Sequence, residues 1–250
     1  MASFVPETLV AAVVIAAVAG VVRGITGFGG AMVMSPPLAL LLGPWLAVPV
    51  ALLLESLVAL PMVVQTRRLV RWRVLAPICI AAALTVPLGV HVLVTSDPQL
   101  VRRAIAAIVI VFALLLLRGW RYAGAQRVST SAGLGALSGA MLGATSVGAP
   151  PVILYLLSGP DPVETTRANL TLYLVISSAA GLVMLWLRGV LGLQAASTAL
   201  LLAPGYYGGL ALGVRLFPYF SDTRFRQFAL LLLIGVSTVI LLAPAPERTS

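Results

Sequence analysis

Long apolar segments constrain this chain more than any other feature of its sequence. A transmembrane helix needs about 20 residues to cross the hydrocarbon core of a bilayer. Four segments reach that length: 46–66, 74–95, 165–187 and 193–214. Two further segments, 101–117 and 225–243, lie near its lower limit. We predict that all of these segments are membrane-crossing helices.

The composition agrees with a surface that faces lipid. Of the 250 residues, 60% are hydrophobic and only 9% are charged, and the mean hydropathy is +1.09. A soluble domain carries about 25% charged residues, so this chain has too little charge to coat a surface in water. The high apolar fraction excludes a disordered chain. The single Cys79 excludes a disulfide framework.

The positive charge of the chain is also explained by a membrane. The 16 basic residues are all arginines, and with 7 acidic residues they give a formal charge of +9. The arginines lie mainly between apolar segments, as the positive-inside rule describes. We therefore expect a lipid bilayer and no nucleic acid as the partner. Glu7 and the lack of basic residues before it argue against a cleaved signal peptide.

Glycine and proline break two other apolar stretches, 8–42 and 132–158, at related positions. Both stretches contain the pattern Gly-x3-Gly-x4-Gly, and a Gly-Pro pair follows each of them. The triplet Leu-Gly-Val recurs at 88–90 and 212–214 at a similar offset. We infer one integral membrane domain over residues 1–250, built of two homologous halves, 1–124 and 125–250. Internal duplication with a broken helix in each half is typical of secondary transporters.

The predicted fold is an all-α polytopic membrane protein with about eight membrane segments. Each half has a Gly/Pro-broken or re-entrant helix followed by three transmembrane helices. If each broken segment is one kinked crossing, the halves are parallel; if each is a hairpin, the halves are inverted. The inverted arrangement gathers more arginines on one side, so the positive-inside rule favours it. Both termini, including Glu247 and Arg248, would then lie outside the cell.

The glycines of the two breaks fall into two groups. A helix broken inside the bilayer exposes N–H groups that a bound anion can satisfy, and glycine lets the backbone approach a ligand. The glycines nearest the proline pairs are therefore candidate ligand contacts: Gly27, Gly29, Gly30 and Gly148. The glycines spaced four apart predict close helix packing: Gly20, Gly24, Gly139 and Gly143. Ser146 occupies the position in the second half that Gly27 has in the first.

Two charged residues lie far from any polar loop. Arg23 stands inside the first glycine cluster, and Glu55 lies in the middle of an apolar segment. Burying either charge alone costs about 2.5–3.5 kcal/mol on insertion scales. Arg23 is a candidate anion ligand, and its alternatives are pairing with Glu55 or extending to the interface. Glu55 is a candidate coupling or gating residue, with a structural partnership as the alternative.

Polar residues also begin the segment after the second Gly-Pro pair. Asp161 and Glu164 have the positions of a helix cap. Arg167 and Asn169 follow them and are candidate substrate contacts, while Asn169 and Tyr173 share a helix face.

Other chemistries find little support. His91 is the only histidine, and one histidine without a cysteine or carboxylate cluster predicts no metal site. Ser146 and His91 are the residue types of a catalytic serine–histidine dyad, but no Gly-x-Ser-x-Gly motif surrounds the serine. We therefore expect no enzyme. No strand precedes the glycines and no lysine exists, which argues against phosphate-binding loops. We expect no cofactor.

The motifs of both halves resemble those of the TauE/SafE family. They are Arg23-Gly-Ile-Thr-Gly-Phe-Gly-Gly30, Gly148-Ala-Pro-Pro-Val-Ile-Leu-Tyr-Leu-Leu-Ser-Gly-Pro160 and Arg167-Ala-Asn169. The resemblance covers nearly the whole chain. It implies a bacterial inner-membrane transporter, often an exporter, of small anions such as sulfite or organosulfonates. The second half has Ala149 after Gly148 where the first has two glycines, so the halves have diverged.

The resemblance and the residues together predict a secondary transporter with a midplane site at the two glycine breaks. Its halves would rock about that site in alternating access. A non-transporting membrane assembly or sensory partner and a passive anion channel are the alternatives. Substrate, direction, coupling ion and the presence of a homo-oligomer stay open.

Overall fold

A computed structural model describes residues 6–66, 69–120, 122, 124, 126–159, 161–220 and 223–242. These residues form ten α-helices and no strand. The helices are α1 (Pro6–Thr26), α2 (Gly30–Leu42), α3 (Pro44–Thr66), α4 (Trp72–Thr95), α5 (Pro98–Leu117), α6 (Val128–Thr145), α7 (Ala149–Leu156), α8 (Val163–Leu187), α9 (Leu193–Phe220) and α10 (Thr223–Leu242). Glu247 and Arg248, which bear on the predicted side of the C-terminus, lie outside the described residues.

The two predicted breaks are confirmed. The stretch 8–42 is divided into α1 and α2 by Gly27 and Gly29, which have φ of 79° and 88°. Glycine has no Cβ to oppose these left-handed conformations. The stretch 132–158 is divided into α6 and α7 at residues 146–148. The six other predicted segments each lie within one helix, apart from the last residue of 225–243.

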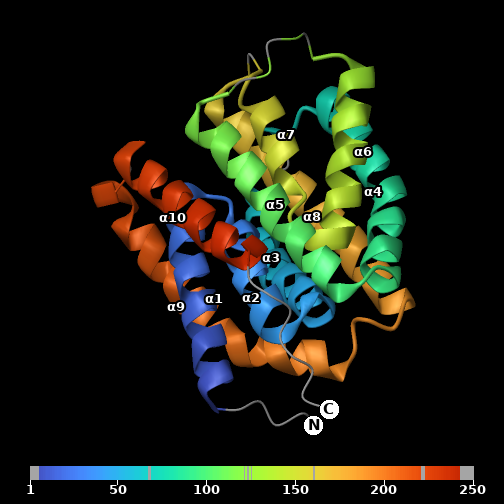
Figure 1. The fold of residues 1–250 in the computed structure, drawn as a ribbon. Helices are drawn as coiled ribbons and strands as arrows, with labels where there is room; N and C mark the ends of the chain where they lie inside the picture. The colour runs from blue at the N-terminus through green and yellow to red at the C-terminus, as the bar shows by residue number, and fades with distance from the viewer. Residues whose placement is uncertain are drawn as a thin grey trace.

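Each broken segment turns back on itself (Figure 1). In that view α1 rises from the lower edge to the middle of the molecule and α2 returns downward. In the second half α6 descends from the upper edge and α7 returns upward. The first helices of the two halves therefore enter the molecule from opposite sides.

Helices pair across the two halves of the sequence. The most extensive packing is that of α4 with α6 and of α1 with α9, so each half's first helix lies along a helix of the other half. In the same way α5 packs against α10 and α3 against α8. The breaks after α1 and α6 are thus held in the middle of one interlocked bundle.

Backbone contact between the paired helices depends on glycine, as predicted for the glycines spaced four apart. A Cβ on Gly20 would overlap the Tyr206 carbonyl of α9, and one on Gly139 would overlap the Ala82 carbonyl of α4. Gly24 and Gly143 face the backbones of α9 and α4 in the same manner. Small residues at these positions let two helices approach to backbone contact.

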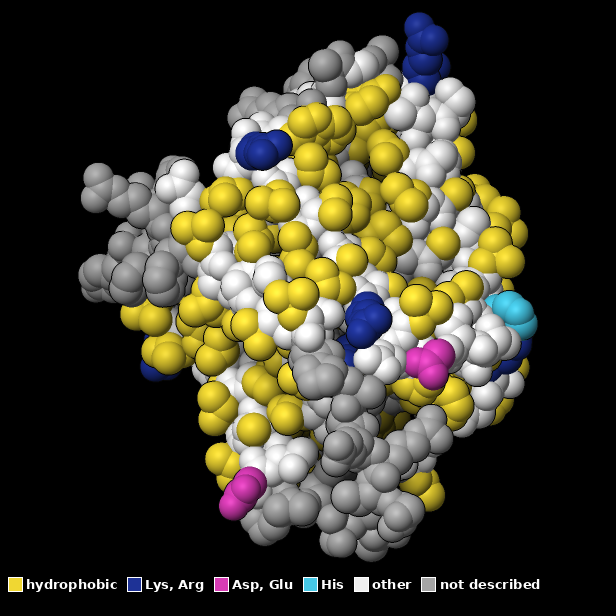
Figure 2. All heavy atoms as spheres, viewed as in Figure 1, with side chains coloured by type: hydrophobic (Ala, Val, Ile, Leu, Met, Phe, Trp, Pro, Cys, Tyr) yellow, Lys and Arg dark blue, Asp and Glu magenta, His cyan; other side chains and the backbone are white. Residues whose placement is uncertain are grey.

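The outer surface is apolar. Large aliphatic side chains face outward along the helices, for example Leu84 (72% exposed), Leu88 (63%) and Leu200 (75%). Figure 2 shows hydrophobic side chains over most of the described part of one face, with few charges among them. Five helices in the described part of the chain are long and apolar enough to span a bilayer: α1, α4, α5, α8 and α9. The molecule is therefore an all-helical polytopic membrane protein.

Two alanine substitutions on α6 test the backbone packing. Gly139→Ala would place a Cβ against the Ala82 carbonyl, next to the hydrogen bond from Thr85 Oγ1 to the Ala136 carbonyl (2.7 Å). Overpacking of this kind costs about 1–3 kcal/mol. We expect Gly139→Ala to lower the midpoint of thermal unfolding in detergent. Gly133→Ala meets open space and should leave that midpoint unchanged or raise it. Equal effects of the two variants would contradict this packing.

Candidate functional site

The turn between α1 and α2 is built by its glycines and one threonine. The Gly27 N–H donates to the Arg23 carbonyl (2.8 Å) and ends α1. Thr26 Oγ1 donates to the Val22 carbonyl (2.8 Å), and the Phe28 N–H donates to Thr26 Oγ1 (3.4 Å). A Cβ on Gly27 or Gly29 would meet no atom within 4 Å, so space is left beside this turn.

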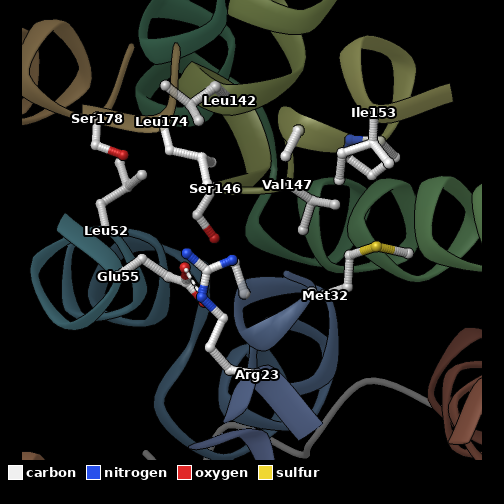
Figure 3. Close-up of a pocket in the computed structure, with 14 residues that line it drawn as sticks. Arg23, Met32, Leu52, Glu55, Leu142, Ser146, Val147, Ile153, Leu174 and Ser178 are labelled. Carbon is white, nitrogen blue, oxygen red and sulfur yellow. Dashed lines mark ion pairs between the residues drawn. The ribbon is translucent and has the colours of Figure 1, made fainter. Parts of the chain in front are cut away.

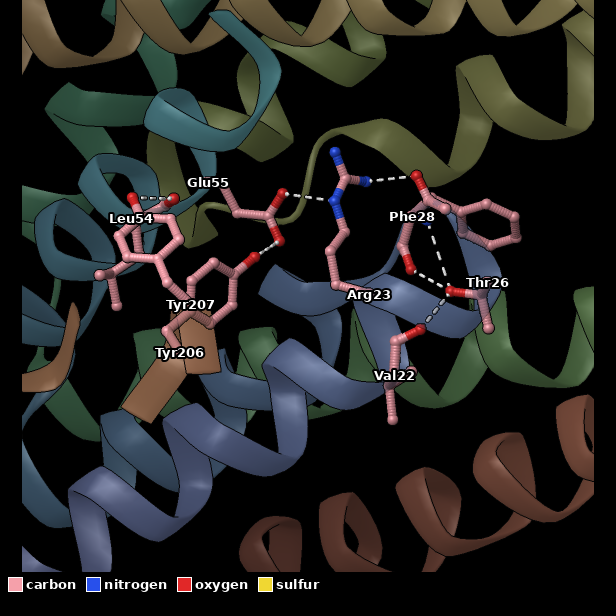
Figure 4. A network of polar contacts seen from close by, with 9 residues as sticks. Val22, Arg23, Thr26, Phe28, Leu54, Glu55, Tyr206 and Tyr207 are labelled. Atoms are coloured by element: carbon pink, nitrogen blue, oxygen red, sulfur yellow. Dashed lines mark hydrogen bonds and ion pairs between the residues drawn. The ribbon is translucent and has the colours of Figure 1, made fainter. Parts of the chain in front are cut away.

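Arg23 brings a buried positive charge to this turn (Figure 4). Its side chain is on the last turn of α1, and the residue is only 5% exposed. Nη1 donates to the Gly27 carbonyl (2.8 Å), and Nε lies 3.5 Å from Glu55 Oε2. The first of these contacts also places a positive charge at the C-terminus of α1, where the helix dipole favours it.

Glu55 supplies the counter-charge from α3. The residue is 7% exposed, and Tyr206 of α9 donates its hydroxyl to Glu55 Oε1 (2.8 Å). Both carboxylate oxygens therefore have partners, one from each half of the sequence. A Cβ on Gly30 would overlap Glu55 Oε1 and crowd the Tyr206 hydroxyl. Gly30 thus makes room for this ion pair, and the structure assigns it no open space for a ligand.

The second break differs from the first. Ser146 has φ of 60°, so it takes the left-handed conformation that Gly27 has in the first half. Gly148 has φ of −102°, and a Cβ there would overlap Leu142 and the Ser138 carbonyl of α6. Its lack of a side chain lets the chain pass close to α6. Gly148 does not line the central cavity described below, and its contact with a ligand stays a prediction.

A small cavity lies between the two breaks (Figure 3). Its volume is about 30 Å³, enough for roughly one or two water molecules. The predicted residues Arg23, Gly29, Ser146 and Glu55 all line it. The Arg23 guanidinium points across the cavity toward Ser146 (Figure 3).

Helix ends give the cavity a second source of positive potential. The first residues of α2 and α7, including Ala31 and Ala149, belong to its lining. Backbone N–H groups at helix N-termini carry partial positive charge and favour anions. The start of α2 has such free N–H groups, whereas at the start of α7 Pro150 and Pro151 have no N–H and leave Ala149 as the donor. Arg23 and these two helix starts line one small volume. The remaining lining is apolar apart from Glu55, Ser146 and Ser178.

A hydrogen bond between two serines joins α2 to the second break. Ser35 of α2 and Ser146 of the second break are both buried, and their hydroxyl oxygens are 2.7 Å apart. Sequence reasoning missed Ser35 and Tyr206. Neither has a pattern that distinguishes it, because each partner lies more than one hundred residues away in the chain.

Two predicted site residues lie elsewhere. Arg167 is exposed near the start of α8 and does not line the cavity. Asn169 is fully buried, and its Oδ1 accepts a hydrogen bond from the Arg71 N–H (2.9 Å). Asp161 pairs with the Arg71 side chain, and Pro162 takes the N-cap position of α8. Asp161 is therefore not the predicted cap, because its carboxylate is held by the start of α4.

No catalytic dyad forms at the second break. The Ser146 hydroxyl bonds to Ser35 inside the molecule, whereas His91 is exposed on α4. No group of three or more His, Cys, Asp or Glu residues that could hold a metal ion occurs within the described ranges.

Comparison with known protein families matches residues 12–240 to the family described as Sulfite exporter TauE/SafE. The chain belongs to this family. The TauE/SafE match covers both halves and both breaks. Members of the family are membrane transporters rather than enzymes, in agreement with the apolar helical bundle. No curated protein and no solved structure gave a match.

Two tyrosine variants test the buried ion pair. Tyr206→Phe removes the hydroxyl that donates to the Glu55 carboxylate, while Tyr207→Phe removes a hydroxyl that donates to the Leu54 carbonyl (3.1 Å). A buried acceptor left without its donor costs about 1–3 kcal/mol, more when it is charged. We expect Tyr206→Phe to lower the unfolding midpoint in detergent more than Tyr207→Phe does. The reverse order would show that the Tyr206 bond adds little.

Proposed function

We propose that this TauE/SafE protein is a secondary transporter of small sulfur-containing anions such as sulfite or organosulfonates. The observation that carries the proposal is the buried guanidinium of Arg23, which lines a central cavity together with the starts of α2 and α7. The family supports an exporter-like activity. It also supports a bacterial inner membrane as the location.

The chemistry of the cavity suits an oxyanion. Sulfite and sulfonate oxygens accept several hydrogen bonds at once, and a guanidinium offers N–H donors in a planar fork. The start of α2 adds backbone N–H donors without adding side-chain volume, whereas the start of α7 adds only that of Ala149, because Pro150 and Pro151 have none. Gly29 lines the cavity without a side chain, and a Cβ there would meet no atom within 4 Å.

The cavity of about 30 Å³ has room for roughly one or two water molecules. We therefore expect the helices around the breaks to move apart when a sulfonate enters. Opening alternately to the two sides would be the motion of a secondary transporter. A passive channel would instead need a continuous path.

The four tryptophans indicate how the molecule sits in the bilayer. Trp45 and Trp186 are exposed at the start of α3 and near the end of α8, and Trp72 and Trp120 at the start of α4 and just after α5. Exposed tryptophans concentrate at membrane interfaces. These helix ends are therefore expected to lie at the two surfaces of the bilayer.

This placement supports inverted repeats, with two hairpins and six crossing helices. With two hairpins, the starts of α4, α6 and α8 and the ends of α5 and α9 fall on one side, and the start of α5 and the end of α8 on the other. Among the described residues the first side has Arg71, Arg73, Arg118, Arg127, Arg167 and Arg215, and the second has Arg102, Arg103 and Arg188. The positive-inside rule then assigns the first side to the cytoplasm.

Cysteine labelling separates the inverted from the parallel topology. In a Cys79→Ser background, Ser129→Cys and Gln194→Cys place single thiols at the exposed starts of α6 and α9. Inverted halves put them on opposite membrane sides, whereas parallel halves put them on the same side. We expect a membrane-impermeant thiol reagent added outside cells to label Gln194→Cys only. Labelling of both variants from one side would rule out the hairpins.

Transport in proteoliposomes tests the substrate class and the role of Arg23. We expect saturable uptake of labelled sulfite by the wild-type protein and its loss in Arg23→Ala. Arg103→Ala, which removes an exposed arginine of α5, should keep uptake. Taurine and sulfate serve as competitors that define the preferred anion.

The alternatives give other results. Flux that rises linearly with sulfite concentration would indicate a passive channel. Absence of uptake for every sulfur oxyanion, together with no effect of these anions on stability, would favour a non-transporting assembly or sensory partner.

A further inference from the structure

Glu55 occupies the position that a transported anion would need. Its carboxylate lies 3.5 Å from Arg23 Nε at the edge of the cavity. Arg23 and Glu55 are the only charged residues in the lining of that cavity among the described residues. An anion that reaches Arg23 therefore meets a carboxylate already bound to it.

The charges of the site restrict what can bind. With Arg23 ionised and Glu55 ionised, the empty site has no net charge. Adding a singly charged anion would leave one uncompensated negative charge in an apolar interior, which costs several kcal/mol. Protonation of Glu55 removes that excess. The site then again has no net charge, with the anion on Arg23.

We propose that Glu55 is an internal competitor of the substrate, released from Arg23 by taking up one proton when a singly charged anion binds. This inference rests on the proposed function and adds to it the charge of the substrate and its coupling. The carboxylate gains a proton and becomes a neutral acid, while the anion oxygens accept hydrogen bonds from the guanidinium. One proton therefore enters the site with each anion.

Tyr206 can form a hydrogen bond with both the carboxylate and the protonated form of Glu55. Its hydroxyl donates to the carboxylate in the structure (2.8 Å). A phenol hydroxyl can also accept a hydrogen bond, so its oxygen can accept one from the O–H of the neutral acid. The neutral acid thus keeps a buried polar partner after Arg23 has turned to the anion.

Among the described residues, the charged or titratable groups around Glu55 are Arg23 from α1 and Tyr206 and Tyr207 from α9. The helices α2, α6, α7 and α8 and the second break contribute apolar side chains and the hydroxyls of Ser146 and Ser178 to the cavity. Within the part of the chain that the structure describes, Glu55 is thus the one carboxylate in the lining.

Calorimetry on the purified full chain counts the protons. The probe is methanesulfonate, a monoanion that does not titrate between pH 6 and pH 8.5. The buffers are amines of different ionisation enthalpy, because sulfonate buffers would compete. We expect one proton taken up per anion and an affinity that falls about tenfold per pH unit. Glu55→Gln should take up none and bind with an affinity independent of pH. Glu164→Gln, which changes an exposed glutamate of α8, should behave as the wild type.

The outcomes distinguish this inference from the proposed function. Wild-type binding without proton uptake, or the same pH dependence in Glu55→Gln, would overturn the role of Glu55 and leave an anion transporter in place. No binding of methanesulfonate or sulfite and no uptake of either would overturn both. If Glu55→Gln fails to fold because Arg23 loses its partner, the wild-type proton count alone decides: a value near zero overturns the inference.

Discussion

The buried charge of Arg23 is the constraint on which the centre of this molecule depends. A guanidinium that is 5% exposed in an apolar bundle needs a counter-charge, and Glu55 of α3 provides it. The ion pair in turn explains the residues that surround it. Gly30 has no side chain because a Cβ would overlap the carboxylate, and Tyr206 of α9 satisfies the second carboxylate oxygen. An ion pair between two segments of one half is thus completed by a helix of the other half.

Glycine packing limits how the molecule can move around that centre. Because α1 lies in backbone contact with α9, and α6 with α4, each half holds the first helix of the other. Closely packed backbones leave little freedom to slide. The two sequence halves therefore cannot rock as separate bodies unless these contacts break. Movement that opens the central cavity is easier at the short helices α2 and α7, which begin at the two turns.

The sequence predicted the parts of the fold that depend on local pattern. Apolar length located the crossing helices, and paired glycines located the breaks and the close contacts, because these features are set within one segment. The sequence left the pairing of Arg23 with Glu55 as one of several alternatives, and it could not show that this pair forms or that Tyr206 and Ser35 complete the site. Those contacts join residues far apart in the chain. The same limit explains Arg167 and Asn169, which share the family's motif but lie at the start of α8, away from the cavity.

Electroneutrality links the Arg23–Glu55 pair to the coupled transport proposed above. A transporter that returns without its substrate has to close around an empty site, and a bare guanidinium would resist closure in an apolar interior. In the proposed mechanism Glu55 removes that barrier by neutralising Arg23 when the site is empty. An anion bound together with a proton is neutral in the same sense. The anion without the proton, and the proton without the anion, each leave one net charge at the site. In the proposed mechanism closure therefore favours the empty form and the doubly loaded form, and this preference alone would couple anion movement to proton movement.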